Sequence, residues 1–364
     1  MMEEIHEILN ALSSSSKKDV LATIIRVEGS AYRKEGTSML FRNDGTKVGM
    51  LSPGCLETDL SYRVPEIVKH RISQTIVYNL QGEHDAYWGQ GSGCNGIIHV
   101  LLEPIDEEHH NHLVTLKWQL EQGNRVTLIK RLDLDERVTD YLFISDNQQL
   151  FGKWNGGDSS LIKRQIQQIH QTHPKSGVVN SPELSTNLYI HSFEPKPRLI
   201  VFGAGSDAIP LVKVASMVGF SVLVADWREA LCTEENFPDA HQLLVGFPTE
   251  VVNKLTLTKR DSVLILTHHF KRDQEILQLL MNRELKYLGI IGTRDRTHRL
   301  FDGAEIPPEI SSPAGLLIGA VGPEEIAVSI VAELIQLHRK RRSGVVIQLD
   351  GKRDHRGLSS GGYK

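Results

Sequence analysis

Apolar residues in the first half of the chain follow two different periods, which predict a mixture of helices and strands. A 3.6-residue spacing puts Ile5, Ile8 and Leu12 on one face of a helix over residues 3–12. Further helices are predicted at 55–72, 107–122 and near 158–171, and strands at 20–27, 37–41, 47–51, 75–80, 96–102, 125–129 and 140–144. Asp44-Gly45 between two of these strands favours a tight hairpin. We therefore predict a mixed α+β domain.

From Arg198 onward the pattern changes to strands that alternate regularly with helices. Strands are predicted at 198–202, 221–225, 241–245, 262–267 and 286–291, and helices at 206–218, 273–282 and 323–340. Such alternation predicts a parallel sheet. Two prolines stiffen the segment just before it. We divide the chain into an N-terminal α+β domain (1–192), a linker (193–197), a Rossmann-like domain (198–342) and a C-terminal tail (343–364).

The first strand of the alternating half ends in a glycine pair that predicts a nucleotide-binding turn. Gly203 permits the tight turn, Gly205 lets backbone N–H groups approach a pyrophosphate, and the small Ala208 lets the following helix pack on the strand. Asp226 ends the next strand 21 residues after Gly205, the spacing of an acid that binds ribose hydroxyls. Arg228 nearby would suit a ribose phosphate instead. The same turn can also serve packing alone.

Polar residues follow two other strands of the predicted parallel sheet. His268 follows the strand at 262–267, and Gly292, Thr293 and Arg294 follow the strand at 286–291. Because the carboxyl ends of parallel strands share one edge, we expect these residues beside the glycine turn. Arg294 can offer a bidentate fork to a phosphate. His268 can contact a ligand or stand there for structural reasons alone.

The composition describes an ordinary globular protein of 364 residues, with 40% hydrophobic and 24% charged residues. A net charge of −4 argues against nucleic-acid binding, which requires a basic surface. The acidic N-terminus has no signal-peptide core, and no apolar run is long enough for a membrane helix. Three cysteines make no disulfide framework, so we expect a cytoplasmic protein without contact to membranes.

Two of the cysteines stand in segments that allow close approach of a ligand. Cys55 follows Ser52-Pro53-Gly54 and opens a predicted helix, whose positive end favours a thiolate. Cys94 lies in a glycine-rich loop. Either thiol can act as a soft metal ligand or a sulfur acceptor, and either can be an inert buried thiol. We expect the two to lie together, facing the edge with the glycine turn, and we assign no role to Cys232.

A series of motifs in one order resembles the xanthine dehydrogenase accessory factors, the XdhC/CoxI family. The N-terminal motifs are RVEGSAYR (26–33), SPGCLE (52–57), GCNG (93–96) and LLEP (101–104). The C-terminal motifs are GAGSDA (203–208), LTH (266–268), LGIIGTR (288–294) and GAVGPEEIAVSI (319–330). The resemblance thus extends over both predicted domains.

This resemblance implies a non-catalytic chaperone of the molybdenum cofactor, a pterin dithiolene (molybdopterin) that bears a phosphate and sometimes a nucleotide. Such a protein holds the cofactor while a cysteine desulfurase supplies sulfur, and then assists insertion into a molybdenum hydroxylase apoenzyme. The Rossmann edge would take the phosphate, and Cys55 and Cys94 would shelter the molybdenum. A homodimer fits this role. Two alternatives stay open: an oxidoreductase that binds NAD or NADP, with His268 as proton donor, and an interaction scaffold.

Overall fold

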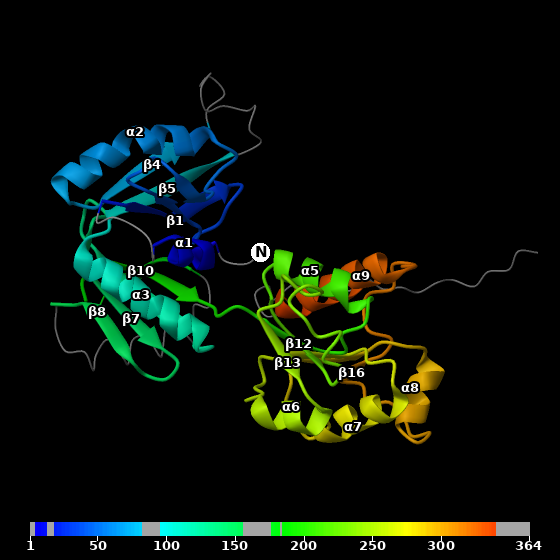
Figure 1. The fold of residues 1–364 in the computed structure, drawn as a ribbon. Coiled ribbons are helices and arrows are strands. Elements are labelled where there is room, and N and C mark those ends of the chain that lie inside the picture. Colours follow the sequence, from blue (N-terminus) through cyan, green and yellow to red (C-terminus); the bar gives the residue numbers. More distant parts are fainter. Residues whose placement is uncertain (1–3, 13–17, 82–94, 156–175, 183, 340–364) are drawn as a thin grey trace, which may run out of the picture.

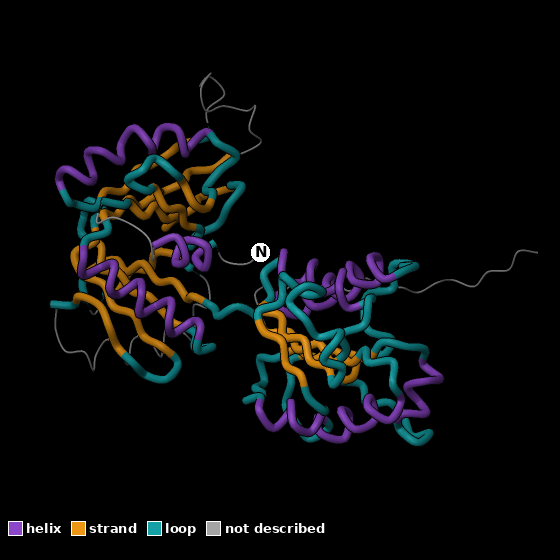
Figure 2. The backbone as a smooth tube through the Cα atoms, in the orientation of Figure 1, coloured by secondary structure: helices purple, strands orange, loops and turns teal. Residues whose placement is uncertain are grey.

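Three β-sheets organise the protein, as a computed structural model of residues 4–12, 18–81, 95–155, 176–182 and 184–339 shows (Figure 1). Two five-stranded antiparallel sheets come from the first half of the chain, and a six-stranded parallel sheet comes from the second. The predicted class, a mixed α+β half followed by a Rossmann-like half, is confirmed. Figure 2 shows helices on both sides of the parallel sheet.

The first antiparallel sheet holds the predicted hairpin. Its strand order is β3 (Lys47–Gly49), β2 (Ser38–Phe41), β1 (Val20–Ser30), β5 (Asn95–Pro104) and β4 (Gln74–Asn79). Phe41 pairs with Lys47, and Gly45 in the turn has φ +83°, the conformation for which glycine is favoured. Helix α2 (Cys55–His70) covers this sheet through Leu56 and Leu60, which are fully buried.

The second antiparallel sheet is larger than the sequence predicted. Its order is β8 (Leu150–Lys153), β7 (Val138–Ser145), β6 (Val126–Leu132), β10 (Thr186–Phe193) and β9 (Gly177–Ser181). Sequence reasoning found β6 and β7 but not the other three, because these strands are short or alternate weakly between apolar and polar residues. Helices α1 (Ile5–Leu12) and α3 (Glu107–Glu121) share one core with both sheets. The helix predicted near 158–171 lies outside the described residues.

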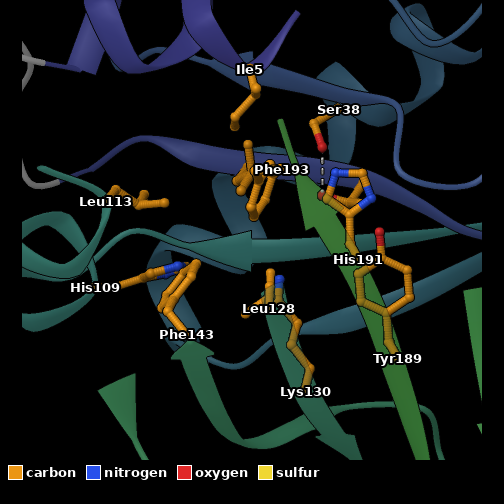
Figure 3. A pocket seen from close by; sticks show the side chains of 12 residues that line it. Ile5, Ser38, His109, Leu113, Leu128, Lys130, Phe143, Tyr189, His191 and Phe193 are labelled. Atoms are coloured by element: carbon orange, nitrogen blue, oxygen red, sulfur yellow. Dashed lines mark hydrogen bonds between the residues drawn. The ribbon is translucent and has the colours of Figure 1, made fainter. Parts of the chain in front are cut away.

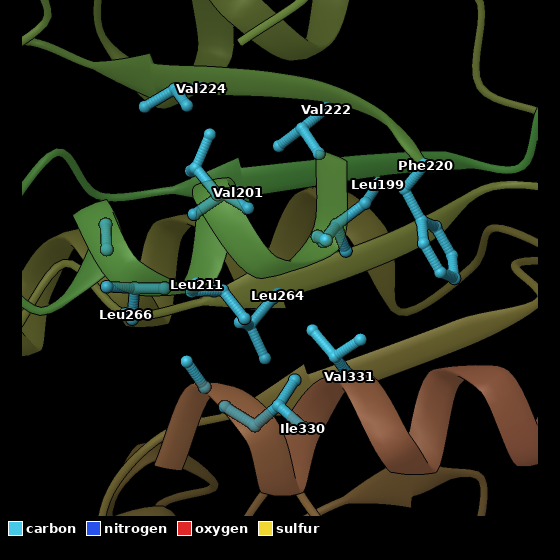
Figure 4. Close-up of a cluster of buried hydrophobic side chains, with 14 of the residues drawn as sticks. Leu199, Val201, Leu211, Phe220, Val222, Val224, Leu264, Leu266, Ile330 and Val331 are labelled. Carbon is cyan, nitrogen blue, oxygen red and sulfur yellow. The ribbon is translucent and has the colours of Figure 1, made fainter. Parts of the chain in front are cut away.

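The parallel sheet has the order β13 (Gln242–Val245), β12 (Ser221–Asp226), β11 (Arg198–Phe202), β14 (Ser262–Ile265), β15 (Tyr287–Ile290) and β16 (Ile310–Ser311). Helices α5 (Ala208–Met217) and α9 (Pro323–Arg339) cover one face, and α6 (Pro248–Lys254), α7 (Phe270–Leu280) and α8 (Arg294–Leu300) cover the other (Figure 1). Side chains of β11 alternate between these faces. Leu199 and Val201 enter the core under α5 and α9 (Figure 4), whereas Ile200 and Phe202 enter the opposite core. The sequence missed the short elements α6, α8 and β16.

The two halves of the chain meet at the amino ends of the parallel strands. Arg260, in the turn before β14, donates a hydrogen bond to the carbonyl of Gly123 (2.7 Å) and forms an ion pair with Asp146. The linker enters at the same edge, where Glu194 pairs with Arg125 at 2.8 Å. These contacts therefore lie at the edge of the sheet opposite to the glycine turn.

We expect the protein to lose stability between pH 6.5 and about 4 because of two half-buried histidines. Burial lowers the pKa of His338 from 6.5 to about 4, with help from Lys286, and burial lowers the pKa of His6 to about 4 as well. The unfolded chain takes up these protons near pH 6.5, but the folded protein does not. Above pH 6.5 both histidines are neutral in the folded and the unfolded chain, so the full free energy of unfolding is present. Below pH 6.5 each histidine lowers the free energy of unfolding, by up to about 2 kcal/mol at pH 5.

Urea unfolding at pH 7.5 and pH 5 measures this loss. His338→Gln should flatten the dependence on pH, because its side chain takes up no proton in either state. An unchanged pH dependence in this variant would contradict the assignment to His338.

Candidate functional site

The glycine turn forms where the sequence predicted it, between β11 and α5. Gly203 has φ +124°, and a Cβ atom there would lie 2.5 Å from the carbonyl oxygen of Leu266. The close approach of the segment after β14 therefore requires glycine. A Cβ atom on Gly205 would come near only one group, the Asp207 side chain at 2.6 Å. Ala208 is fully buried at the start of α5, as expected for a small packing residue.

Asp226 lies at the end of β12, but its carboxylate is already occupied within the chain. It accepts hydrogen bonds from the backbone N–H of Ala204 (2.7 Å) and of Arg228 (2.8 Å). The Arg228 guanidinium binds both oxygens, at 2.9 and 2.7 Å. Burial opposes ionisation of Asp226, but these hydrogen bonds outweigh it and lower its pKa. Asp226 thus braces the glycine turn, and a ribose hydroxyl would have to displace Arg228 to reach it.

His268 does lie at the glycine turn, in contact with a residue that the sequence analysis did not single out. Its Nε2 is 2.6 Å from Oδ2 of Asp207, the residue immediately before α5. The His268 side chain is 59% exposed, and its backbone has φ +57°, which is uncommon for a residue other than glycine. An acid just before the first helix of the Rossmann half was the available signal for Asp207, since carboxylates are favoured at a helix N-terminus.

The loop after β15 reaches the same edge, and its two arginines differ in role. Thr293 caps α8, its hydroxyl accepting the N–H of Arg296 at 3.2 Å. The Arg296 guanidinium binds the buried carboxylate of Asp273 at 2.6 Å and packs against Gly292, so this arginine is structural. Arg294 is exposed, and within the described part of the chain it forms no ion pair. Arg294 is thus exposed at this edge, and its contact with an anion stays a prediction.

The structure describes Cys232 in full, the backbone of Cys55, and nothing of Cys94. Cys55 is the first residue of α2, after Gly54 with φ +123°, but its side chain is outside what the structure describes. Cys94 lies outside the described residues altogether. The contact between these thiols, and their approach to the glycine turn, therefore stay predictions. Cys232 is buried, with its Sγ 3.7 Å from the carbonyl of Val224, and burial raises its pKa.

A small cavity lies between the two antiparallel sheets (Figure 3). Its volume is about 10 Å³, and it is lined by residues from α1, α3 and both sheets, among them Ser38, Lys130, Phe143 and His191. A space of this size holds about one water molecule, so a pterin cofactor does not fit there.

The described residues contain no set of three His, Cys, Asp or Glu side chains arranged to hold a metal ion. Within the same residues, no helix is long and apolar enough to cross a membrane. The carboxyl edge of the parallel sheet, with the glycine turn, His268 and Arg294, is therefore the candidate site.

The fold and this edge define a protein with a Rossmann-type C-terminal domain attached to a two-sheet α+β half. Three family models match the chain: the XdhC and CoxI family at 13–79, the BH1974-like central domain at 107–194, and the XdhC Rossmann domain at 199–334. The chain belongs to the XdhC/CoxI family.

Relatives support this assignment over nearly the whole length. A probable xanthine dehydrogenase subunit of Bacillus subtilis is 42% identical, over 93% of this chain and 99% of that protein. The molybdenum cofactor insertion chaperone PaoD of Escherichia coli is 22% identical, over 90% of this chain and 87% of that protein. A crystal structure described as a xanthine dehydrogenase from Bacillus halodurans is 46% identical, covers 93% of this chain and 97% of that one, and superposes with a TM-score of 0.83.

Proposed function

We propose that this protein is an accessory factor that binds the molybdenum cofactor and assists its maturation for a xanthine dehydrogenase-type molybdenum hydroxylase. The observation that carries the proposal is the carboxyl edge of the parallel sheet. There the Asp207 side chain is the one group that a Cβ atom on Gly205 would meet, and the Arg294 side chain after β15 is exposed. Backbone N–H groups at a helix start and an arginine guanidinium both suit a phosphate. An anion at this turn requires the Asp207 carboxylate to move away from Gly205, because its Oδ1 lies over that residue while its Oδ2 pairs with His268. The full-length similarity to PaoD supports this role.

The metal end of the cofactor is proposed to lie against Cys55 and Cys94. A thiol at the start of α2 would be a soft ligand, suited to molybdenum or to sulfur. In this proposal a cysteine desulfurase provides the sulfur, and the molybdenum hydroxylase apoenzyme receives the cofactor. The pterin's dithiolene and metal centre supply any redox chemistry, and the chain's own residues bind and orient the cofactor.

The geometry favours this role over the alternative of an oxidoreductase that binds NAD. Recognition of NAD in a Rossmann domain commonly uses an acid at the end of the second strand to bind the ribose hydroxyls. Here that acid is Asp226, which is 2% exposed and covered by Arg228. A ligand recognised through its phosphate does not need this carboxylate.

Binding of molybdopterin to the purified full-length protein, compared with NAD and NADP, tests the proposal. Gly205→Val should abolish binding while the fold persists, because the new side chain fills the turn and its Cβ atom would come near only the Asp207 side chain. Arg294→Ala should weaken binding by about 1.5–3 kcal/mol through loss of a charge-assisted contact. Arg294→Lys should restore only part of the affinity, because the planar fork is lost.

Arg283→Ala is the matched control, since Arg283 is an exposed arginine before β15, at the opposite edge of the sheet. The control should bind like the unaltered protein. Equal molybdopterin affinity in all four variants would show that the carboxyl edge of the parallel sheet does not bind the cofactor.

A further inference from the structure

Near the glycine turn, two loops and the start of a helix bring two aromatic rings and an arginine together. Trp227 follows β12, Phe247 follows β13, and Arg272 lies in the first turn of α7, after β14. The Arg272 guanidinium carbon is 4.6 Å from the ring centre of Phe247 and 5.8 Å from that of Trp227. We call these three residues the aromatic platform. Phe247 is 45% exposed, so one part of the platform faces solvent.

The arginine of the platform is held in place rather than free. Its Nη1 donates to Oε2 of Glu275 at 2.7 Å, and the other oxygen of Glu275 accepts the hydroxyl of Thr249 at 2.9 Å. A second guanidinium, that of Arg228, lies 4.7 Å from the Trp227 ring and is fixed by Asp226. The platform is therefore already organised without a ligand, and both guanidiniums are paired with carboxylates.

The platform is continuous with the glycine turn. Trp227 follows directly on Asp226, whose carboxylate accepts the N–H of Ala204 inside that turn. On the other side, the His269 ring meets Trp227 edge-on at 5.7 Å, while the adjacent His268 pairs with Asp207. A ligand with a phosphate at the turn would thus place its next group over the platform.

The chemistry of this surface selects a planar heterocycle. Nucleic-acid bases stack on aromatic rings and on arginine guanidinium planes, and ligands of parallel sheets bind at the carboxyl edge. Recognition through ribose hydroxyls at Asp226 would require displacement of Arg228, which binds both carboxylate oxygens. The remaining means of recognition are stacking on the base and charge on the phosphate.

We propose that the aromatic platform binds the base of a nucleoside 5′-phosphate whose phosphate lies at the glycine turn. This inference rests on the proposed function, in which that nucleotide would be the one attached to the cofactor. A free nucleotide and a nicotinamide dinucleotide offer the same chemistry, so the test includes both.

Calorimetric binding of GMP, CMP, AMP and inorganic phosphate to the full-length protein provides the test. At least one nucleotide should bind more tightly than phosphate. Phe247→Ala and Arg272→Ala should each weaken nucleotide binding about tenfold or more and leave phosphate binding unchanged. Phe247→Tyr should retain affinity, because it keeps a stacking ring. Arg299→Ala, which removes another guanidinium near a ring (Phe270, 5.4 Å), is the control and should have no effect.

Fluorescence gives a second readout that a merely structural role would not alter. The chain has four tryptophans, and a base stacked at the platform should quench the emission of Trp227. Trp227→Phe should remove that quenching and keep most of the affinity, whereas Trp118→Phe, on α3, should leave the quenching in place.

The outcomes separate this proposal from the proposed function. Binding of molybdopterin without binding of any nucleotide would overturn the platform and leave the chaperone role intact. Nucleotide binding that Phe247→Ala and Arg272→Ala do not weaken would also overturn the platform. Nucleotide binding that depends on the platform, without molybdopterin binding, would support the platform and overturn the chaperone role. If NAD or NADP binds more tightly than every mononucleotide, the base at the platform belongs to a nicotinamide dinucleotide.

Discussion

Replacing Gly203 by alanine is expected to destabilise the Rossmann half by about 3 kcal/mol or more. The backbone at Gly203 has φ +124°, a conformation that a residue with a Cβ atom adopts only under strain. The new methyl group would also lie 2.5 Å from the carbonyl oxygen of Leu266 and 3.0 Å from the backbone N of Thr267. Neither is the end of a flexible side chain, so β11 and the segment after β14 would have to move apart.

Gly205→Ala is the matched control for this prediction, because its methyl group would meet only the carboxylate at the end of the Asp207 side chain. Chemical unfolding followed by circular dichroism and tryptophan emission should show a large loss of stability for Gly203→Ala and little change for Gly205→Ala. Similar stabilities for the two variants would contradict the close approach at Gly203. The comparison also separates the two glycines, because a Cβ atom would meet backbone at Gly203 and a side chain at Gly205.

Lys130→Met is expected to cost about 3–5 kcal/mol of unfolding free energy in the N-terminal half. Lys130, on β6, is 1% exposed and forms an ion pair with Glu103, on β5, which is 4% exposed. The pair therefore joins the two antiparallel sheets across their shared interior. Removing the ammonium group would leave a buried carboxylate without its partner, and such a charge is costly away from water.

The double variant Glu103→Leu/Lys130→Met tests the physical reason. It removes both charges and keeps similar volumes, so most of the lost stability should return. Urea unfolding of the unaltered protein, the two single variants and the double variant gives the coupling between the residues. A single variant that loses less than about 1 kcal/mol, the range of exposed ion pairs, would show that water reaches this carboxylate.

Much of the fold could be predicted because its signals are local. The hairpin at Asp44-Gly45 depends on a turn that favours positive φ, and the strands of the parallel sheet are continuous apolar runs. The strands β9 and β10 escaped prediction because their burial depends on a sheet assembled from distant segments. The short elements α6 and α8 have too few residues for a helical period to stand out.

The candidate site shows the same division. Gly203, Gly205 and Ala208 could be found from spacing alone, since the turn between β11 and α5 needs small residues at those positions. The position of His268 beside this turn, where it pairs with Asp207, also followed from the shared edge of parallel strands. The role of Asp226 did not follow, because its contact with Arg228 depends on side-chain directions that spacing does not specify.

The sequence by itself thus determined a Rossmann-type half, its glycine turn and the edge of the sheet where we propose that a ligand binds. Only the tertiary structure decided which charges at that edge are already neutralised by neighbours: Asp226 by Arg228, and Asp273 by Arg296. Only the tertiary structure brought Trp227 and Phe247, from two loops, together with Arg272 at the start of α7. The physical reason is that periodicity reports which residues share an element, whereas ion pairs and ring stacks form between elements that folding alone brings together.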